Sequence, residues 1–207
     1  MKLVIFGATG KTGIELVKQA LEKGHAVTAF VRDPARMAIE GENLTLVTGD
    51  VFDPASVNQA VQGQDAVVCA LGAGSDLKKT TVRTTGTINI ISAMQKNNVK
   101  RLMVVTAMGV GESWDNMSLF NKFFFATLLK SSRDDHEKQE AAVKESELDW
   151  TIVRPSGLTD TPRTGVYEVG ENIPANTSKI ARADVADLIL KELEQNSLIG
   201  KAVTITN

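Results

Sequence analysis

The chain has 207 residues, of which 43% are apolar, and this length and composition suit one compact α/β domain spanning residues 1–207. A formal charge of −2 provides no broad basic field, which excludes nucleic acid and anionic membranes as default partners. The single cysteine excludes a disulfide within the chain, and no apolar run approaches the roughly 18 residues of a membrane-spanning helix.

The first residues pass from an apolar strand through a glycine-rich turn into a helix. Residues 2–6 are rich in Val and Ile, and residues 11–23 carry apolar side chains at helical spacing. Between them, Gly7, Gly10 and Gly13 are spaced as GxxGxxG. In such a turn the glycines allow a tight bend, close approach of a pyrophosphate and close helix packing. A glycine triplet alone indicates only a sharp turn, but the strand and helix around it predict dinucleotide binding.

The remaining apolar runs alternate with helical patterns. Further strands are predicted at 26–31, 44–47, 66–69, 101–105, 150–153 and 202–205, and further helices at 54–61, 80–96, 133–147 and 183–194. The spacing from Ser132 to Asp135 is that of a capping box, which places Asp134 and Asp135 in the first turn of a helix. This alternation predicts a doubly wound, mainly parallel sheet with helices on both faces.

In a doubly wound sheet, ligands bind outside the carboxyl ends of the strands. The residues that directly follow predicted strands should therefore converge at one edge. They are Arg32, Asp50, Leu71, Gly72, Thr106, Pro155 and Ser156. Their convergence is stronger evidence for a site than any one of them.

Arg32 stands after the second strand, where an acidic residue would bind the adenosine ribose of NAD. A guanidinium at this position favours the 2′-phosphate of NADP, and Arg36 provides a second positive charge. The alternative is that both arginines are solvated and that Asp33 is the ribose acid. Asp50 and Val51 should lie near the adenine, unless Asp50 only caps a turn.

Several motifs resemble those of a known superfamily. They are GATGKTG, FVRDPAR, GDV, QDAVVCALG, TTVRTTGTINIISAM, the DDH at residues 134–136 and ESELDWTIVRP. They resemble the atypical short-chain dehydrogenase/reductase superfamily, and within it the small NADPH-dependent biliverdin reductase B/flavin reductase family. The resemblance extends from Met1 to about Leu193. It implies a single-domain Rossmann fold and hydride transfer from NADPH to flavins (FMN, riboflavin) or open-chain tetrapyrroles, with flavin as a substrate and not a prosthetic group.

The resemblance also implies which residues hold the cofactor. The pyrophosphate would be wrapped by Gly7, Thr9, Gly10, Lys11, Thr12 and Gly13. The rest of NADPH would meet Arg32 and Arg36 at the 2′-phosphate, Asp50 and Val51 at the adenine, Leu71 and Gly72 at the adjoining ribose, and Thr106 and Pro155 at the nicotinamide.

Three positions depart from the family pattern. The superfamily's YxxxK pair is absent, since the only tyrosine, Tyr167, stands four residues before Glu171. Ala107 replaces a serine of the family, and Ser156 replaces a histidine. A tyrosine–lysine proton relay is therefore not expected.

The proton donor for a tetrapyrrole stays open among Ser156, His136 and water. The alternative for His136 is a partly exposed helix residue that interacts with Glu140. For the planar acceptor we expect Ala107, Trp114, Ser156 and Tyr167 as contacts. The segment around Trp114 includes Phe120 and Phe123–Phe125, and it would either form an apolar wall or pack as a helix on the protein body.

No metal site is predicted, because two distant histidines and one cysteine in an apolar run lack ligand spacing. The N-terminus carries no charged leader, so we expect a cytoplasmic protein, and we expect it to be a monomer. Two other functions remain: a non-enzymatic dinucleotide sensor, favoured by Ala107 and the missing tyrosine–lysine pair, and an epimerase or dehydratase of nucleotide sugars. The short C-terminal region argues against the latter.

Overall fold

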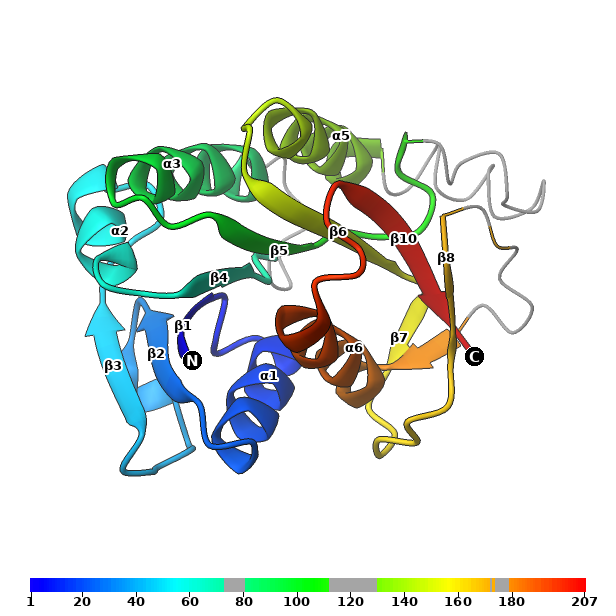
Figure 1. The fold of residues 1–207 in the computed structure, drawn as a ribbon, viewed down its shortest axis with the longest axis horizontal. Coiled ribbons are helices and arrows are strands. Elements are labelled where there is room, and N and C mark those ends of the chain that lie inside the picture. Colours follow the sequence, from blue (N-terminus) through cyan, green and yellow to red (C-terminus); the bar gives the residue numbers. More distant parts are fainter. Residues whose placement is uncertain (73–80, 112–129, 172, 174–178) are drawn as a thin grey trace.

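The computed structural model describes residues 1–72, 81–111, 130–171, 173 and 179–207. Its central feature is an eight-stranded sheet, which runs across the middle of Figure 1. In spatial order the strands are β3 (Leu44–Thr48), β2 (Ala26–Val31), β1 (Lys2–Phe6), β4 (Ala66–Cys69), β5 (Arg101–Val105), β6 (Asp149–Pro155), β10 (Lys201–Thr206) and β8 (Glu168–Gly170). Every pair is parallel except β10 with β8.

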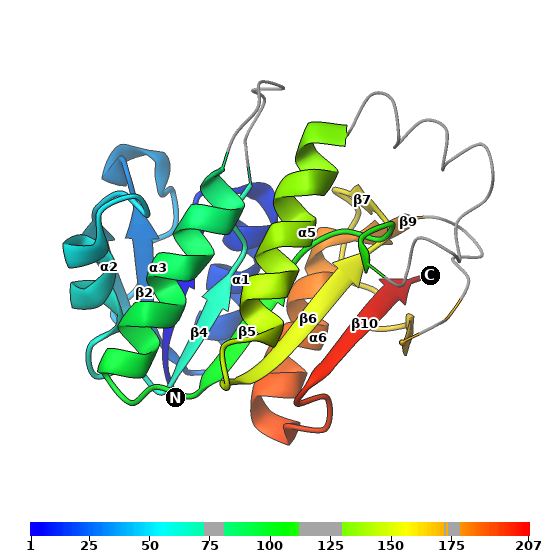
Figure 2. The ribbon, with the colours of Figure 1, turned by 90° about the horizontal axis from the view of Figure 1, so that it is seen from above.

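Helices cover both faces of this sheet (Figure 1). On one face lie α1 (Lys11–Glu22) and α6 (Arg182–Gln195), and on the other lie α2 (Pro54–Val61), α3 (Val82–Lys96) and α5 (Lys130–Lys144). Seen from above, α3 and α5 lie side by side over the middle strands (Figure 2). A short 3-10 turn, η1 (Pro34–Arg36), follows β2. The predicted fold class is confirmed.

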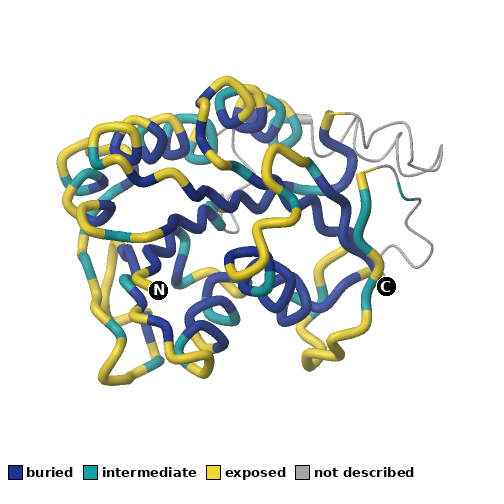
Figure 3. The backbone as a smooth tube through the Cα atoms, in the orientation of Figure 1, coloured by how far each residue is buried: buried dark blue, intermediate teal, exposed yellow. Residues whose placement is uncertain are grey.

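The alternation of side chains along β1 explains the two cores. Leu3 and Ile5 are buried under α1 and α6, whereas Val4 and Phe6 are buried under α2, α3 and α5. Because successive strand residues point to opposite faces, one apolar strand supplies both layers. The buried stretches of the tube in Figure 3 follow the central strands for the same reason.

Three short strands are absent from the prediction. β7 (Gly157–Thr159) and β9 (Lys179–Ala181) pair in a small parallel sheet of their own, and β8 closes the edge of the main sheet. Each has only three residues, too few for a periodic pattern. Among the helices of the described residues, none combines the length and the apolar composition needed to cross a bilayer.

The predicted start of α5 is wrong. The helix begins at Lys130, so Ser132 lies inside it and not at its cap. The carboxylate of Asp135 instead caps α3: it accepts the backbone N–H of Arg83 at 3.3 Å and of Thr84 at 3.1 Å. These are the free N–H groups of the first turn of α3, whose own N-cap, Thr81, makes no side-chain cap.

Candidate functional site

The order of the strands places the site. β1 lies between β2 and β4. The chain continues from β1 to β2 and β3 on one side of it, and then crosses back to add β4 and the later strands on the other side. At this switch point the turns after β1 and β4 meet. A Cβ on Gly7, which has a φ of +81°, would lie 2.3 Å from the carbonyl oxygen of Ala70. Gly7 therefore lets the two turns touch, as a dinucleotide crevice requires.

The third glycine of the turn is needed for packing. A Cβ on Gly13 would lie 2.1 Å from the carbonyl oxygen of Gly7 and 2.8 Å from the Cα of Ala8. Both neighbours are backbone atoms that cannot rotate away. Gly13 thus allows α1 to lie against the end of β1.

The second glycine caps α1 and faces outward. Gly10 is the N-cap in extended conformation, with φ −74° and ψ 158°, and is exposed. Within the described residues no side chain caps this end, and the first turn holds no acid. The free N–H groups and the positive end of the helix dipole form a site for an anion such as a pyrophosphate.

Two arginines stand at the end of β2 with their charges free. Arg32 and Arg36 are exposed, and no carboxylate of the described residues pairs with either. Asp33, the alternative ribose ligand, uses its carboxylate to accept the N–H of Ala35 at 3.0 Å, as the N-cap of η1. Among the charged side chains of this loop that the structure describes, Arg32 and Arg36 make no hydrogen bond or ion pair, whereas one carboxylate oxygen of Asp33 is used in the cap.

The loop after β3 is held by its own hydrogen bonds. Asp50 Oδ1 accepts the N–H of Phe52 at 2.9 Å, so the carboxylate caps a turn, as the alternative interpretation had it. Val51 is buried, and its carbonyl accepts Asn89 Nδ2 at 2.8 Å. Leu71, half-buried, lies over Gly86, where a Cβ would come within 2.7 Å of its Cδ1. Gly72 is exposed at the same edge.

The end of β5 is attached to a buried ion pair. Thr106 Oγ1 donates to Glu140 Oε1 at 2.9 Å, and Arg154 approaches both carboxylate oxygens, through Nε at 2.9 Å and Nη2 at 2.5 Å. The side chains of Arg154 and Glu140 are 1% and 3% exposed. Gly111, with φ +55°, lies against this pair, since its Cβ would stand 2.6 Å from Arg154 Nη2. Glu140 thus joins α5, β5 and β6.

The residues after β6 are also engaged. Ser156 is buried, and its hydroxyl donates to Thr206 Oγ1 of β10 at 3.1 Å. The Pro155 carbonyl accepts the N–H of Met108 at 2.9 Å, which joins the ends of β5 and β6. Ala107, which stands between Thr106 and Met108 in the chain, is half-buried. Thr106, Ala107, Pro155 and Ser156 thus come together as predicted, with both hydroxyls already donating to protein atoms.

His136 lies in a buried polar cluster beneath the end of β4. Its Nδ1 is 3.1 Å from Gln139 Oε1, and Gln139 Nε2 donates to Thr87 Oγ1 at 3.0 Å. Cys69 Sγ lies 3.5 Å from the same hydroxyl, and burial raises the pKa of this thiol. The expected contact of His136 with Glu140 is wrong, because Glu140 is taken by Arg154. Burial, with the charge of Arg83, lowers the pKa of His136 to about 4.

This low pKa predicts acid sensitivity. The unfolded chain takes up the proton near pH 6.5, whereas folded His136 stays neutral down to about pH 4. Because the unfolded state binds more protons in this window, the free energy of unfolding falls as the pH is lowered from 6.5 to 4, by up to about 3 kcal/mol. Urea denaturation of wild type and His136→Gln across this range tests it. Equal pH dependence in both proteins would contradict the assignment.

Tyr167 is held on α6. Its hydroxyl donates to Asp187 Oδ2 at 2.8 Å and lies 3.3 Å from Lys191 Nζ. Burial and Asp187 raise the pKa of Tyr167 to about 12, so the phenol stays protonated. The backbone of the preceding loop, Thr164 and Gly165, donates to buried Asp184 of α6. The other expected substrate contact, Trp114, and the four phenylalanines after it lie outside the described residues.

Comparison with known proteins identifies the family. The model of a family described as NAD(P)H-binding matches residues 7–196, from the first glycine of the turn to the end of α6. The chain belongs to this family. Among its relatives, an uncharacterised chloroplastic protein of Arabidopsis thaliana is 31% identical over 212 residues, which cover 99% of this chain and 76% of that protein.

Two solved structures share the whole fold. ChuY of Escherichia coli O157:H7, described as an anaerobilin reductase, is 24% identical with a TM-score of 0.83, covering 100% of this chain and 97% of its own. A short-chain dehydrogenase/reductase of Veillonella parvula in complex with NADP is 20% identical with a TM-score of 0.83, covering 100% and 94%. The predicted Rossmann fold is therefore shared with both structures over the whole of this chain.

The sequence analysis did not predict the contacts that support this candidate edge. Glu140 was considered only as a partner of His136, and its buried pair with Arg154, an arginine within an apolar strand, was not predicted. Asp184 accepts hydrogen bonds from the loop after β7, and Thr206 accepts one from Ser156. Neither residue had a comparable signal in the sequence.

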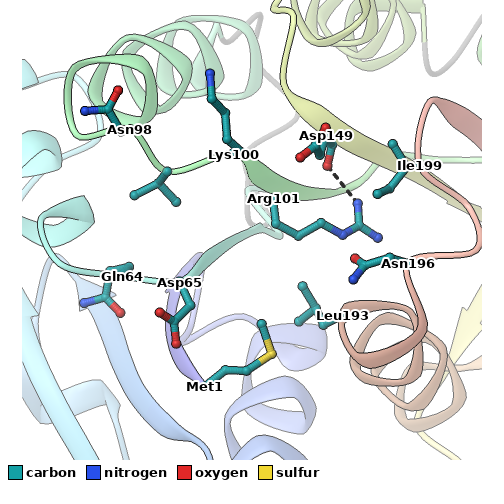
Figure 4. Close-up of a pocket in the computed structure, with 11 residues that line it drawn as sticks. Met1, Gln64, Asp65, Asn98, Lys100, Arg101, Asp149, Leu193, Asn196 and Ile199 are labelled. Carbon is teal, nitrogen blue, oxygen red and sulfur yellow. Dashed lines mark hydrogen bonds between the residues drawn. The ribbon is translucent and has the colours of Figure 1, made fainter.

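A hollow of about 460 Å³ lies at the other edge of the sheet, where β4, β5 and β6 begin (Figure 4). Arg101 crosses it and donates through Nη1 to the Asp149 carbonyl at 2.8 Å. Since its lining comes from the amino ends of the strands, this hollow is separate from the candidate dinucleotide site at their carboxyl ends. Among the described residues no group of three or more His, Cys, Asp or Glu side chains is placed to hold a metal ion.

Proposed function

We propose that the protein is an NADPH-dependent reductase that transfers a hydride to flavins such as FMN and riboflavin, and to biliverdin-like tetrapyrroles. The observation that carries the choice of cofactor is the free pair Arg32 and Arg36, beside an Asp33 that is engaged as a cap. A guanidinium at this place attracts a 2′-phosphate, whereas an acid would repel it. The NADP complex of the Veillonella structure is in keeping with this choice.

This choice predicts tighter binding of NADPH than of NADH. Arg32→Ala should erase most of the difference, because a charge-assisted contact contributes about 1.5–3 kcal/mol, or roughly ten- to 150-fold in affinity. Fluorescence titration of both cofactors into wild type and variant measures it. NADH binding should change little and serves as the internal control. Equal affinities of wild type for the two cofactors would refute the assignment.

The acceptor is inferred from the requirements of hydride transfer and from the absence of a free side chain that could donate a proton among the candidates. NADPH supplies a hydride when bound, and a planar acceptor needs to be held against it in a dry pocket. The two side chains considered as proton donors, Ser156 and His136, both direct polar atoms to protein partners, so neither is free to give a proton to the acceptor, and water remains as the donor. Flavin reduction fits such a site, since water can supply the proton. ChuY, a reductase by its description, shares the fold.

A second candidate function is a dinucleotide sensor without catalysis. The same engagement of the polar side chains, together with Ala107 in place of a serine, favours it. A sensor would bind NADPH with the same dependence on Arg32 but would not oxidise it with any flavin or tetrapyrrole.

A further inference from the structure

A second hollow, of about 300 Å³, opens beside the glycine turn. It lies between the start of α1, the segment that follows β7 and the start of α6. It is lined by Thr9, Lys11, Ile14, Glu15, Asp160, Thr161, Arg182 and Ala183. Its lining combines charged and polar side chains with the apolar Ile14 and Ala183, which suits a ligand group that carries charge.

Two cations in this hollow share one carboxylate. Lys11 Nζ contacts Asp160 Oδ2 at 2.5 Å, and Arg182 Nη1 contacts Asp160 Oδ1. The hydrogen bond from Lys11, together with the charge of Arg182, lowers the pKa of Asp160. The carboxylate of Asp160 thus lies between the two cations, where a bound anion would otherwise lie.

This arrangement is easily opened. The side chains of Lys11 and Asp160 are 70% and 57% exposed, and that of Arg182 is 20% exposed. Ion pairs in contact with water contribute little to stability, so an incoming anion can replace Asp160 at low cost. Glu15 also lines the hollow, but its carboxylate interacts with Gln19 of its own helix, at 3.4 Å.

We propose that Lys11 and Arg182 form a phosphate-binding subsite, and that Asp160 occupies it until a ligand phosphate takes its place. Two sources of phosphate are in reach. Thr9 and Lys11 belong to the turn expected to wrap the pyrophosphate of the cofactor, and Asp160 follows the strand that begins just after Ser156, at the expected acceptor side. The phosphate is therefore that of the dinucleotide or that of FMN, and the latter source rests on the proposed function.

Two substitutions should shift affinity in opposite directions. Arg182→Gln removes one cation and should weaken binding of the phosphate about three- to tenfold, whereas Asp160→Asn removes the competing charge and should tighten it by a similar factor. Arg163→Gln is the matched control, because Arg163 is a 48% exposed arginine of the same loop region that pairs with Asp187 and does not line the hollow. It should leave all affinities unchanged.

The measurement uses three probes: NADPH with the free protein, and FMN and riboflavin with the NADP⁺-loaded protein, all by fluorescence. FMN and riboflavin differ only by the phosphate. If Arg182→Gln and Asp160→Asn shift the FMN affinity in opposite directions and leave the riboflavin affinity unchanged, the subsite binds the phosphate of the acceptor. If they shift the NADPH affinity in opposite directions, it binds the phosphate of the cofactor. The proposal is overturned if the two variants do not shift the NADPH affinity in opposite directions and if FMN either does not shift or shifts equally with riboflavin.

These results are separate from the test of the reductase activity. If no flavin is reduced but the NADPH affinities move in opposite directions, the subsite stands and the proposed acceptor fails. If flavins are reduced and no affinity moves, the reductase stands and the subsite is overturned.

Discussion

Gly10→Val should abolish NADPH binding, with at least about a 100-fold loss of affinity, and leave the protein folded. The extended backbone of Gly10 suits any residue, and its Cβ would lie 3.2 Å from the Gly7 carbonyl oxygen, a contact that a shift of a few tenths of an ångström relieves. The valine side chain would instead fill the space in front of the free N–H groups of α1. Circular dichroism and an NADPH titration measure the two effects.

Gly13→Ala provides the contrasting control within the same turn. Its Cβ would collide with backbone atoms on two sides, so we expect the free energy of unfolding to fall by about 3 kcal/mol. Normal NADPH binding by a folded Gly10→Val variant would show that the glycine turn is not the cofactor site.

Glu140→Ala should lower the free energy of unfolding by about 3–5 kcal/mol. The substitution leaves the guanidinium of Arg154, which is 1% exposed, without its carboxylate, and it removes the acceptor of the Thr106 hydroxyl. Loss of a buried carboxylate that accepts two hydrogen bonds from one guanidinium costs far more than loss of a surface ion pair. Urea denaturation gives the difference in unfolding free energy.

The matched control for Glu140→Ala lies one turn earlier on α5. Glu137 pairs with Arg133 at 2.8 Å, but its side chain is 40% exposed, so Glu137→Ala should cost less than about 1 kcal/mol. A loss below about 1 kcal/mol for Glu140→Ala as well would mean that the buried pair contributes little to the fold.

The core of the fold was predictable because its signals are local. Each central strand is an apolar run bounded by turn residues, and α1 and α6 each carry apolar side chains at helical spacing. The glycine turn was equally clear, since its three glycines stand between a strand and a helix. β7, β8 and β9 were missed because three residues carry no period, and their pairing depends on distant partners.

The supports of the site were less predictable, because they join residues far apart in the chain. Asp135 fits a local cap, yet its carboxylate caps α3, about 50 residues away. Similarly, sequence spacing makes His136 a local partner for Glu140. In the structure, however, Glu140 forms its ion pair with Arg154 of β6. Sequence spacing indicates only pairs that are close in the chain, whereas the fold brings a charged guanidinium from a distant strand to the carboxylate.

Single-turnover oxidation of NADPH by FMN, riboflavin and biliverdin tests the central claim most directly. The account predicts oxidation above the buffer rate with the flavins, and a rate in His136→Ala within about tenfold of wild type, because hydride transfer by positioned rings requires no side-chain acid. No oxidation of bound NADPH by any of the three acceptors, or a loss beyond about a hundredfold in His136→Ala with cofactor binding intact, would contradict it.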